Sequence, residues 1–158
     1  MEGQPRRDLL AVVGPLNRLL RRIEDRCAKE AGLSMWQYAI LSVAAAEAGL
    51  SQTVIAELLG YSKNRIVGDL DELTERGLAE RRPGTDRRAH AIHVTPAGQA
   101  LVAEVRASIW RQEDELLPHL SHEQREALLT LLSSAVAPHR PTLTGGNDDA
   151  SEAAPTNS

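Results

Sequence analysis

The segment that decides the fold runs from Leu50 to Val102 and reads LSQTVIAELLGYSKNRIVGDLDELTERGLAERRPGTDRRAHAIHVTPAGQALV. Its first part predicts a short helix over residues 52–59, followed by a tight turn at Gly60. Ser62 is then expected to cap a second helix. The apolar residues of this second helix recur at i, i+4 and i+7, and they are Ile66, Leu70 and Leu73.

The spacing of apolar residues changes from helical to alternating after this second helix. Residues 78–82 and 91–95 alternate in the manner of short strands, and the polar residues 83–88 between them favour a turn. Thr95-Pro96 then supplies a cap and a proline for the start of another helix. Two helices joined by a tight turn and followed by a hairpin are typical of a winged helix–turn–helix. The expected fold class is mostly α with a small β-hairpin wing.

Helices are also predicted on both sides of this block. Ser34 caps a helix that follows Gly32, and Ser121 starts a last helix with a capping-box pattern. Gly14-Pro15 predicts a kink or a restart in the first helix. That helix has more apolar surface than a small winged module can cover, so a second copy of the chain is its natural cover. Its heptad stripe consists of Leu9, Val13, Leu16, Leu20, Ile23 and Cys27.

The chain is expected to divide into parts with different roles. Residues 1–33 and 118–137 form a helical dimerisation region from both termini, residues 34–96 form the winged helix–turn–helix domain, and residues 97–117 form a connecting helix. Residues 138–158 contain a single large apolar side chain, so they cannot bury enough surface to order themselves, and we expect a disordered tail.

Composition excludes several classes of protein. The 158 residues suit one domain, and no apolar stretch approaches the roughly 20 residues of a membrane helix. The polar N-terminus argues against a secretory signal peptide. The single cysteine, Cys27, excludes an intrachain disulfide and an all-cysteine metal site. We therefore expect a cytoplasmic protein with no membrane contact, no metal and no cofactor.

The front of the second helix of the helix–turn–helix carries side chains suited to DNA. Lys63, Asn64 and Arg65 lie at the N-terminal end, which enters a major groove in this fold. Asparagine pairs well with an adenine edge and arginine with guanine. These residue types predict direct reading of base pairs in double-stranded DNA.

The hairpin adds a local basic segment to a chain whose net charge is −4. The arginines at its tip are always charged and planar, which suits phosphates or a narrow minor groove, and Asp86 is placed to orient one of them. The residues expected to contact DNA are Ser62, Lys63, Asn64, Arg65, Arg81, Arg82, Asp86, Arg87 and Arg88.

Three stretches resemble the MarR-type (multiple-antibiotic-resistance regulator) transcription factors. They are LTERGLAERRPGTDRRA and VTPAG, which match that family's helix end, wing and next helix start, and AGLSMWQYAIL, which is similar to its second helix. The resemblance implies a homodimer whose winged domains read a palindromic operator, most often as a repressor. Gly68 and Asp69 depart from the family pattern, which shifts the expected base contacts toward Asn64 and Arg65.

The resemblance also implies release by a small ligand such as an aromatic acid. Its pocket is expected between the first, second and fifth helices. Trp36 and Tyr38 are the candidate aromatic walls, and Arg18 and Arg22 are the candidate partners of a carboxylate.

Other readings of the sequence stay open at this point. Cys27 is the candidate sensor of a redox-responsive regulator, and His119 and His122 are candidate ligands of a metal-responsive one. A winged module that binds only protein is a further alternative. Motifs of nucleophilic, phosphate-binding or zinc-dependent catalysis are absent from the sequence, so no enzyme is expected.

Overall fold

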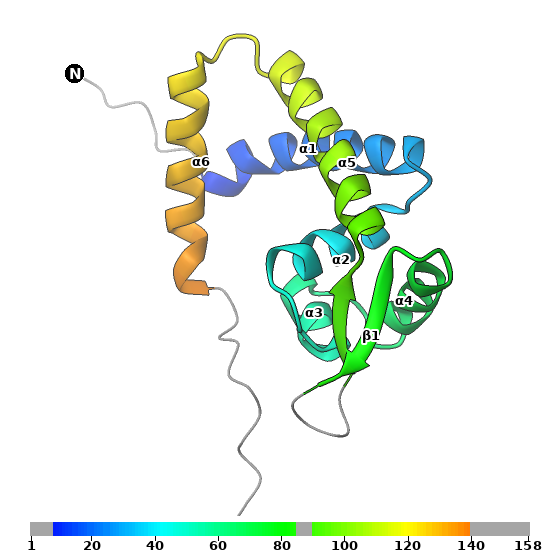
Figure 1. Ribbon diagram of the computed structural model, residues 1–158. Coiled ribbons are helices and arrows are strands. Elements are labelled where there is room, and N and C mark those ends of the chain that lie inside the picture. Colours follow the sequence, from blue (N-terminus) through cyan, green and yellow to red (C-terminus); the bar gives the residue numbers. More distant parts are fainter. Residues whose placement is uncertain (1–7, 85–89, 140–158) are drawn as a thin grey trace, which may run out of the picture.

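The computed structural model describes residues 8–84 and 90–139. Helices form most of this part of the chain, and two strands form an antiparallel hairpin (Figure 1), as the expected fold class requires. The elements are α1 (Leu9–Glu30), α2 (Met35–Ala46), α3 (Gln52–Leu59), α4 (Arg65–Glu75), β1 (Ala79–Pro83), β2 (His90–Val94), α5 (Pro96–Leu116), α6 (His122–Val136) and the 3₁₀ turn η1 (Ala137–His139).

Side-chain caps set where most of these helices begin. The side chains of Ser34, Ser51, Thr95 and Ser121 each accept a hydrogen bond from a backbone N–H in the first turn of the helix that follows. Ser34 and Ser121 form complete capping boxes. These bonds satisfy backbone donors that have no partner within the helix, so the predicted helix starts are confirmed at these four positions.

The hairpin is more firmly joined to the helices than its sequence suggested. Its register pairs Ala79 with Val94 and Pro83 with His90. The segment before α3 adds an isolated bridge between Ser51 and Ala91 on the other side of β2. The predicted hairpin is confirmed with each strand shifted by one residue, and this third segment holds the wing against the helix–turn–helix.

One apolar core unites α2, α3, α4 and the hairpin into a winged block, which lies below α1 in Figure 1. Large apolar side chains from every one of these elements except β1 are fully buried in it, and α5 contributes a valine from above. These residues are Ile40, Leu41, Ile55, Ile66, Leu70, Leu73, Ile92 and Val105. The predicted apolar face of α4 is thus confirmed as core.

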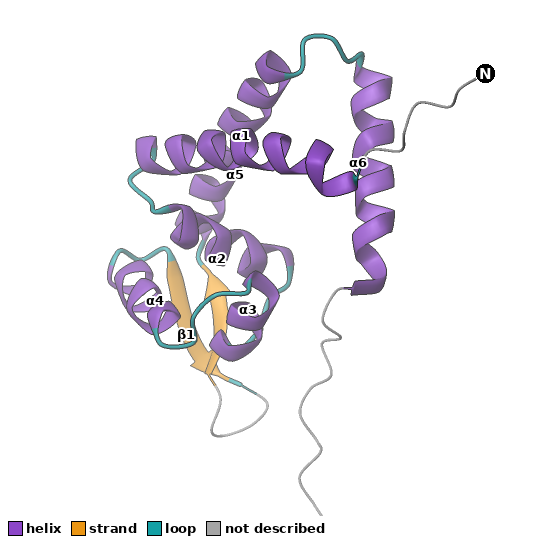
Figure 2. Cartoon of the chain, turned by 180° about the vertical axis from the view of Figure 1, so that it is seen from behind, coloured by secondary structure: helices purple, strands orange, loops and turns teal. Residues whose placement is uncertain are grey.

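The terminal helices extend beyond the winged block, and of α1 only the C-terminal part joins its core, through Ile23, Cys27 and Ala28. Helix α5 rises from it and crosses α1, and both views show α6 standing apart from the block (Figures 1 and 2). Helix α6 buries none of its residues, and the first turns of α1 are equally open, with Leu9 77% and Leu10 80% exposed. None of the helices in residues 8–84 and 90–139 is long and apolar enough to cross a membrane.

Two boundary predictions differ from the structure. A kink or a restart was expected at Gly14-Pro15, and the restart is wrong because helix α1 is continuous through Pro15. Proline removes only one bond of the helical ladder, and the bonds on either side carry the helix across it. The C-terminal tail was expected from residue 138, whereas η1 extends to His139. Residues 140–158 lie outside the described residues.

Candidate nucleic-acid interface

The recognition helix α4 begins later than predicted. Its first helical residue is Arg65 and its N-cap is Asn64, whose side chain makes no capping bond. Ser62 was expected to cap with its side chain, and this is wrong. It acts through its backbone instead, because its carbonyl accepts hydrogen bonds from the N–H groups of Arg65 and Ile66, both at 3.1 Å. Ser62 and Lys63 therefore belong to the turn that precedes the helix.

This late start places two polar side chains at the tip of α4. Asn64 and Arg65 are exposed, and neither has a side-chain hydrogen bond or ion pair among the described residues. Lys63 differs, because its ammonium lies 2.8 Å from a carboxylate oxygen of Glu57 on α3. Such an exposed pair contributes little to stability, so a phosphate can compete for Lys63.

The arginines of strand β1 have partners within the domain. The guanidinium of Arg81 lies 2.7 Å from the carboxylate of Asp71 on α4, so it braces the wing against the recognition helix. Arg82 pairs with Glu80 on the same strand at 2.9 Å. The predicted tip residues, Asp86, Arg87 and Arg88, lie outside the described residues.

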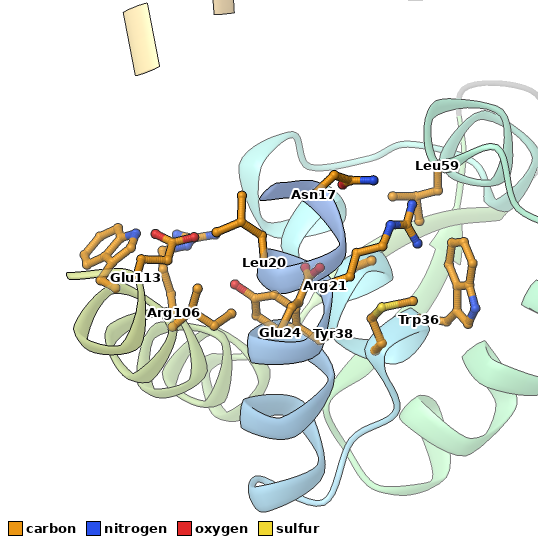
Figure 3. Close-up of a pocket in the computed structure, with 13 residues that line it drawn as sticks. Asn17, Leu20, Arg21, Glu24, Trp36, Tyr38, Leu59, Arg106 and Glu113 are labelled. Carbon is orange, nitrogen blue, oxygen red and sulfur yellow. The ribbon is translucent and has the colours of Figure 1, made fainter. Parts of the chain in front are cut away.

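A cavity of about 420 Å³ opens between α1, α2 and α5 (Figure 3). Trp36 and Tyr38 line it, as the sequence led us to expect. Two arginines and two glutamates face the same space. These four residues are Arg21, Glu24, Arg106 and Glu113, and neither guanidinium forms an ion pair with a described residue.

The predicted carboxylate partners in this cavity were wrong. Arg18 and Arg22 are exposed and do not line it, whereas Arg21 does. The cavity faces one side of α1, and residues three or four apart share a side of a helix. Leu20 and Glu24 line the cavity. Arg21 precedes Glu24 by three residues, so it lies on the same side of α1. Arg106 comes from α5 and had no signal in the sequence, because only the crossing of α5 over α1 brings it there.

The comparisons with known proteins agree with this geometry. A model of the MarR family matches residues 31–89, which include the helix–turn–helix. The repressor CouR, solved on a 23-mer DNA duplex, is 30% identical with a TM-score of 0.68, covering 82% of this chain and 92% of CouR. The chain belongs to the MarR family. CouR of Rhodococcus jostii RHA1 has also been solved with p-coumaroyl-CoA, with a TM-score of 0.69 at 22% identity over 87% of this chain and 96% of CouR.

Two further comparisons concern the fold and a curated relative. MarR of E. coli superposes with a TM-score of 0.73 at 18% identity, covering 84% of this chain and 99% of MarR, which shows the shared fold. A protein of Thauera aromatica assigned to transcriptional regulation of the hcr operon is 33% identical over 102 residues. This match spans 64% of the chain and 61% of that relative. The family consists of transcriptional regulators, in agreement with the expectation that the chain is not an enzyme.

The two glutamates of the cavity carry pKa values above the ordinary range. Burial raises the pKa of Glu24, and the nearby Arg21 guanidinium offsets part of this increase. Burial also raises the pKa of Glu113, and the negative charges of Asp114 and Glu24 raise it further. The folded MarR-family chain therefore disfavours the ionised form of both side chains.

Glu113→Gln is expected to make the chain more stable than wild type at pH 7. Wild type carries the disfavoured charge at that pH and loses it as the pH falls through the raised pKa. The advantage of the variant should therefore shrink as the pH is lowered toward 4.5, the ordinary pKa of the group.

Thermal melting at pH 7 and pH 5, at constant ionic strength, measures this difference. Glu115→Gln, on the exposed part of the same helix, controls for the loss of one negative charge. An advantage of Glu113→Gln that is equal at both pH values would contradict the expectation.

The residues considered from sequence as redox or metal sensors have positions that give no sign of a sensing site. Cys27 is 2% exposed, and its sulfur accepts a hydrogen bond from Gln112 at 3.1 Å. This position suits a small apolar core residue. His119 and His122 belong to no group of three or more metal-ligand side chains in the part of the chain that the structure describes.

Proposed function

We propose that this MarR-family chain is a homodimeric repressor that binds a palindromic operator and is released by a small aromatic acid. The observation that carries the proposal is the pair of exposed side chains, Asn64 and Arg65, at the tip of a recognition helix beside a wing. The same fold is solved on DNA in CouR, at 30% identity over 92% of that protein. A repressor that occupies a promoter excludes polymerase, and this role places the chain with the DNA in the cytoplasm.

The terminal helices support the homodimer. Large apolar side chains on α1 and α6 are exposed in the single chain, and a second copy is the natural partner for them. In this arrangement residues 1–33 and 118–137 hold two copies together, and residues 34–96 of each copy read half of the operator. The exposed side chains include Leu9, Leu10, Val12, Leu129, Leu131 and Val136.

The cavity supports an aromatic acid as the effector. Its volume of about 420 Å³ accepts one small ring compound, and Trp36 and Tyr38 supply apolar walls. Arg21 and Arg106 replace the arginines expected from sequence as partners of a carboxylate. The p-coumaroyl-CoA complex of CouR favours an acyl thioester as a second candidate, whose aromatic end would fill this space.

A footprint over DNA upstream of the coding sequence tests the operator proposal. We expect protection of two inverted half-sites about one helical turn apart, because each wing domain of a dimer enters one major groove. Light scattering should give twice the mass of 17.2 kDa. A monomer in solution, or no protection above that on unrelated DNA, would contradict the proposal.

Release is expected when p-coumarate or p-coumaroyl-CoA is added to the complex with the protected DNA fragment. Arg21→Gln should weaken binding of the active compound by about 2 kcal/mol, the usual value of a hydrogen bond to a charged group. Arg22→Gln is the matched control, since this neighbour lies off the cavity, and it should bind like wild type. Isothermal titration measures both affinities, and equal losses in the two variants would place the carboxylate elsewhere.

A further inference from the structure

The recognition helix α4 carries acidic side chains, and phosphates of DNA would repel their negative charge. Helix α4 contains four of them, and three are held by side chains outside the helix. These contacts fix three of the four carboxylates against α2, β1 and the turn before α4. The three pairs are Asp69 with Tyr61 at 2.8 Å, Asp71 with Arg81 at 2.7 Å, and Glu72 with Gln37 at 2.6 Å. Glu75 is exposed and has no such partner among the described residues.

The first of these pairs reaches the cavity. The Tyr61 hydroxyl donates its hydrogen bond to Oδ2 of Asp69. The Tyr61 ring stacks on Trp36, with ring centroids 4.2 Å apart and planes at 19°. Trp36 is also a wall of the cavity, at the opposite end from Glu113 (Figure 3). Two side-chain contacts therefore connect the cavity wall to the recognition helix.

Asp69 has a second possible partner on its own helix. Arg65 precedes it by four residues, and side chains at this spacing reach each other on one face of a helix. Burial and Asp69 raise the pKa of Tyr61, and the positive charge of Arg65 offsets part of this increase. The structure records the bond from Tyr61 to Asp69 and no ion pair between Arg65 and Asp69 among the described residues.

We propose that Asp69 switches between Tyr61 and Arg65, and that Tyr61 is the positioning residue through which the cavity controls the DNA contact of Arg65. This inference rests on the proposed function and adds a route of regulation to it. While Tyr61 holds Asp69, Arg65 is available to a base. A ligand that displaces Trp36 also displaces Tyr61, and the released carboxylate then pairs with Arg65.

The switch acts at the front of α4 only. The bond between Gln37 and Glu72 holds the second half of the helix to α2, so the helix stays in place when Asp69 changes partner. The negative charge of Asp69 then competes with DNA for the same guanidinium. This competition weakens the operator complex without unfolding the domain.

Operator affinity of three variants tests the switch without any ligand. Tyr61→Phe keeps the stack on Trp36 and loses the hydroxyl, so it should raise the Kd about tenfold. This is less than the loss of both Arg65 contacts of a dimer, because Asp69 competes with the base for the guanidinium and does not remove it. Asp69→Asn should bind as well as wild type, because an amide does not form an ion pair with Arg65. The double variant Tyr61→Phe/Asp69→Asn should recover wild-type affinity, which a purely structural role of Tyr61 would not allow.

Three further variants complete the test: Tyr61→Phe/Glu75→Gln, Trp36→Leu and Trp36→Leu/Asp69→Asn. Tyr61→Phe/Glu75→Gln removes a different negative charge from the same helix and should remain weakened. Trp36→Leu removes the stack from the cavity side, and its loss of affinity should also be reversed by Asp69→Asn. Thermal melting confirms that each variant is folded.

The outcomes separate this inference from the proposed function. Wild type that fails to select the operator overturns the proposed function. If wild type selects the operator but Tyr61→Phe binds it with unchanged affinity, the switch alone is overturned. The same holds if Tyr61→Phe loses affinity and Asp69→Asn does not restore it. If Asp69→Asn restores operator affinity to Tyr61→Phe but not to Trp36→Leu, the connection to the cavity is overturned.

Discussion

Arg65→Ala is expected to reduce affinity for the operator by roughly three orders of magnitude. Arg65 is exposed at the first residue of α4, and in winged helix–turn–helix proteins this end of the helix enters the major groove. A lost bidentate contact to a base costs about 2 kcal/mol, and a dimer on a palindrome loses two of them, about 4 kcal/mol in all. The effect on unrelated DNA should be much smaller, because a contact to a base edge contributes to sequence selection.

Lys63→Ala is the matched control for this prediction. Lys63 lies two residues earlier, in the turn, and is paired with Glu57 at 2.8 Å. Its charge suits a phosphate, so its loss should weaken both DNAs to a similar, smaller extent. Fluorescence anisotropy at one fixed salt concentration measures the affinities of wild type, Arg65→Ala and Lys63→Ala for the operator and for unrelated DNA. Equal losses on operator and unrelated DNA for Arg65→Ala would assign Arg65 to the phosphate backbone.

Gly98→Ala is expected to lower the free energy of unfolding by about 3 kcal/mol, at the upper end of the usual cost of overpacking. Gly98 lies in the first turn of α5, where a Cβ would overlap the carbonyl oxygen of Leu78 and approach Cγ1 of Val94 to 2.7 Å. That oxygen is not free to move, because it accepts a hydrogen bond from the backbone N–H of Thr95 at 3.1 Å. The wing or the start of α5 must therefore shift.

Gly68→Ala is the opposite case in the same chain. Gly68 is interior to α4, and a Cβ there meets no atom within 4 Å. The substitution should raise the free energy of unfolding by roughly 0.5–1 kcal/mol, since alanine loses less backbone entropy in a helix. Urea unfolding at one protein concentration measures both variants, because the stability of the proposed homodimer would depend on concentration. Destabilisation by Gly68→Ala, or tolerance of Gly98→Ala, would contradict the packing described.

The order of the elements and most of their starts follow from local sequence signals alone. Ser34, Ser51, Thr95 and Ser121 cap helices where a hydroxyl precedes an apolar helical pattern, and the change from helical to alternating spacing marks the hairpin. These signals act within a few residues, so no knowledge of distant partners is needed. The local rule failed at Ser62, where the backbone carbonyl closes the turn and the helix starts at Arg65.

Which charged side chains share a site depends on how the helices and the hairpin pack together. Arg106 reaches the cavity because α5 crosses α1, and Arg81 braces the recognition helix because the wing folds back on α4. Tyr61 joins Trp36 to Asp69 across three separate stretches of chain. Charged side chains are long and can pair with many neighbours. Their partners are chosen by the packing of the apolar core, which sets the helix crossings, and the spacing of residues along the chain does not encode those crossings.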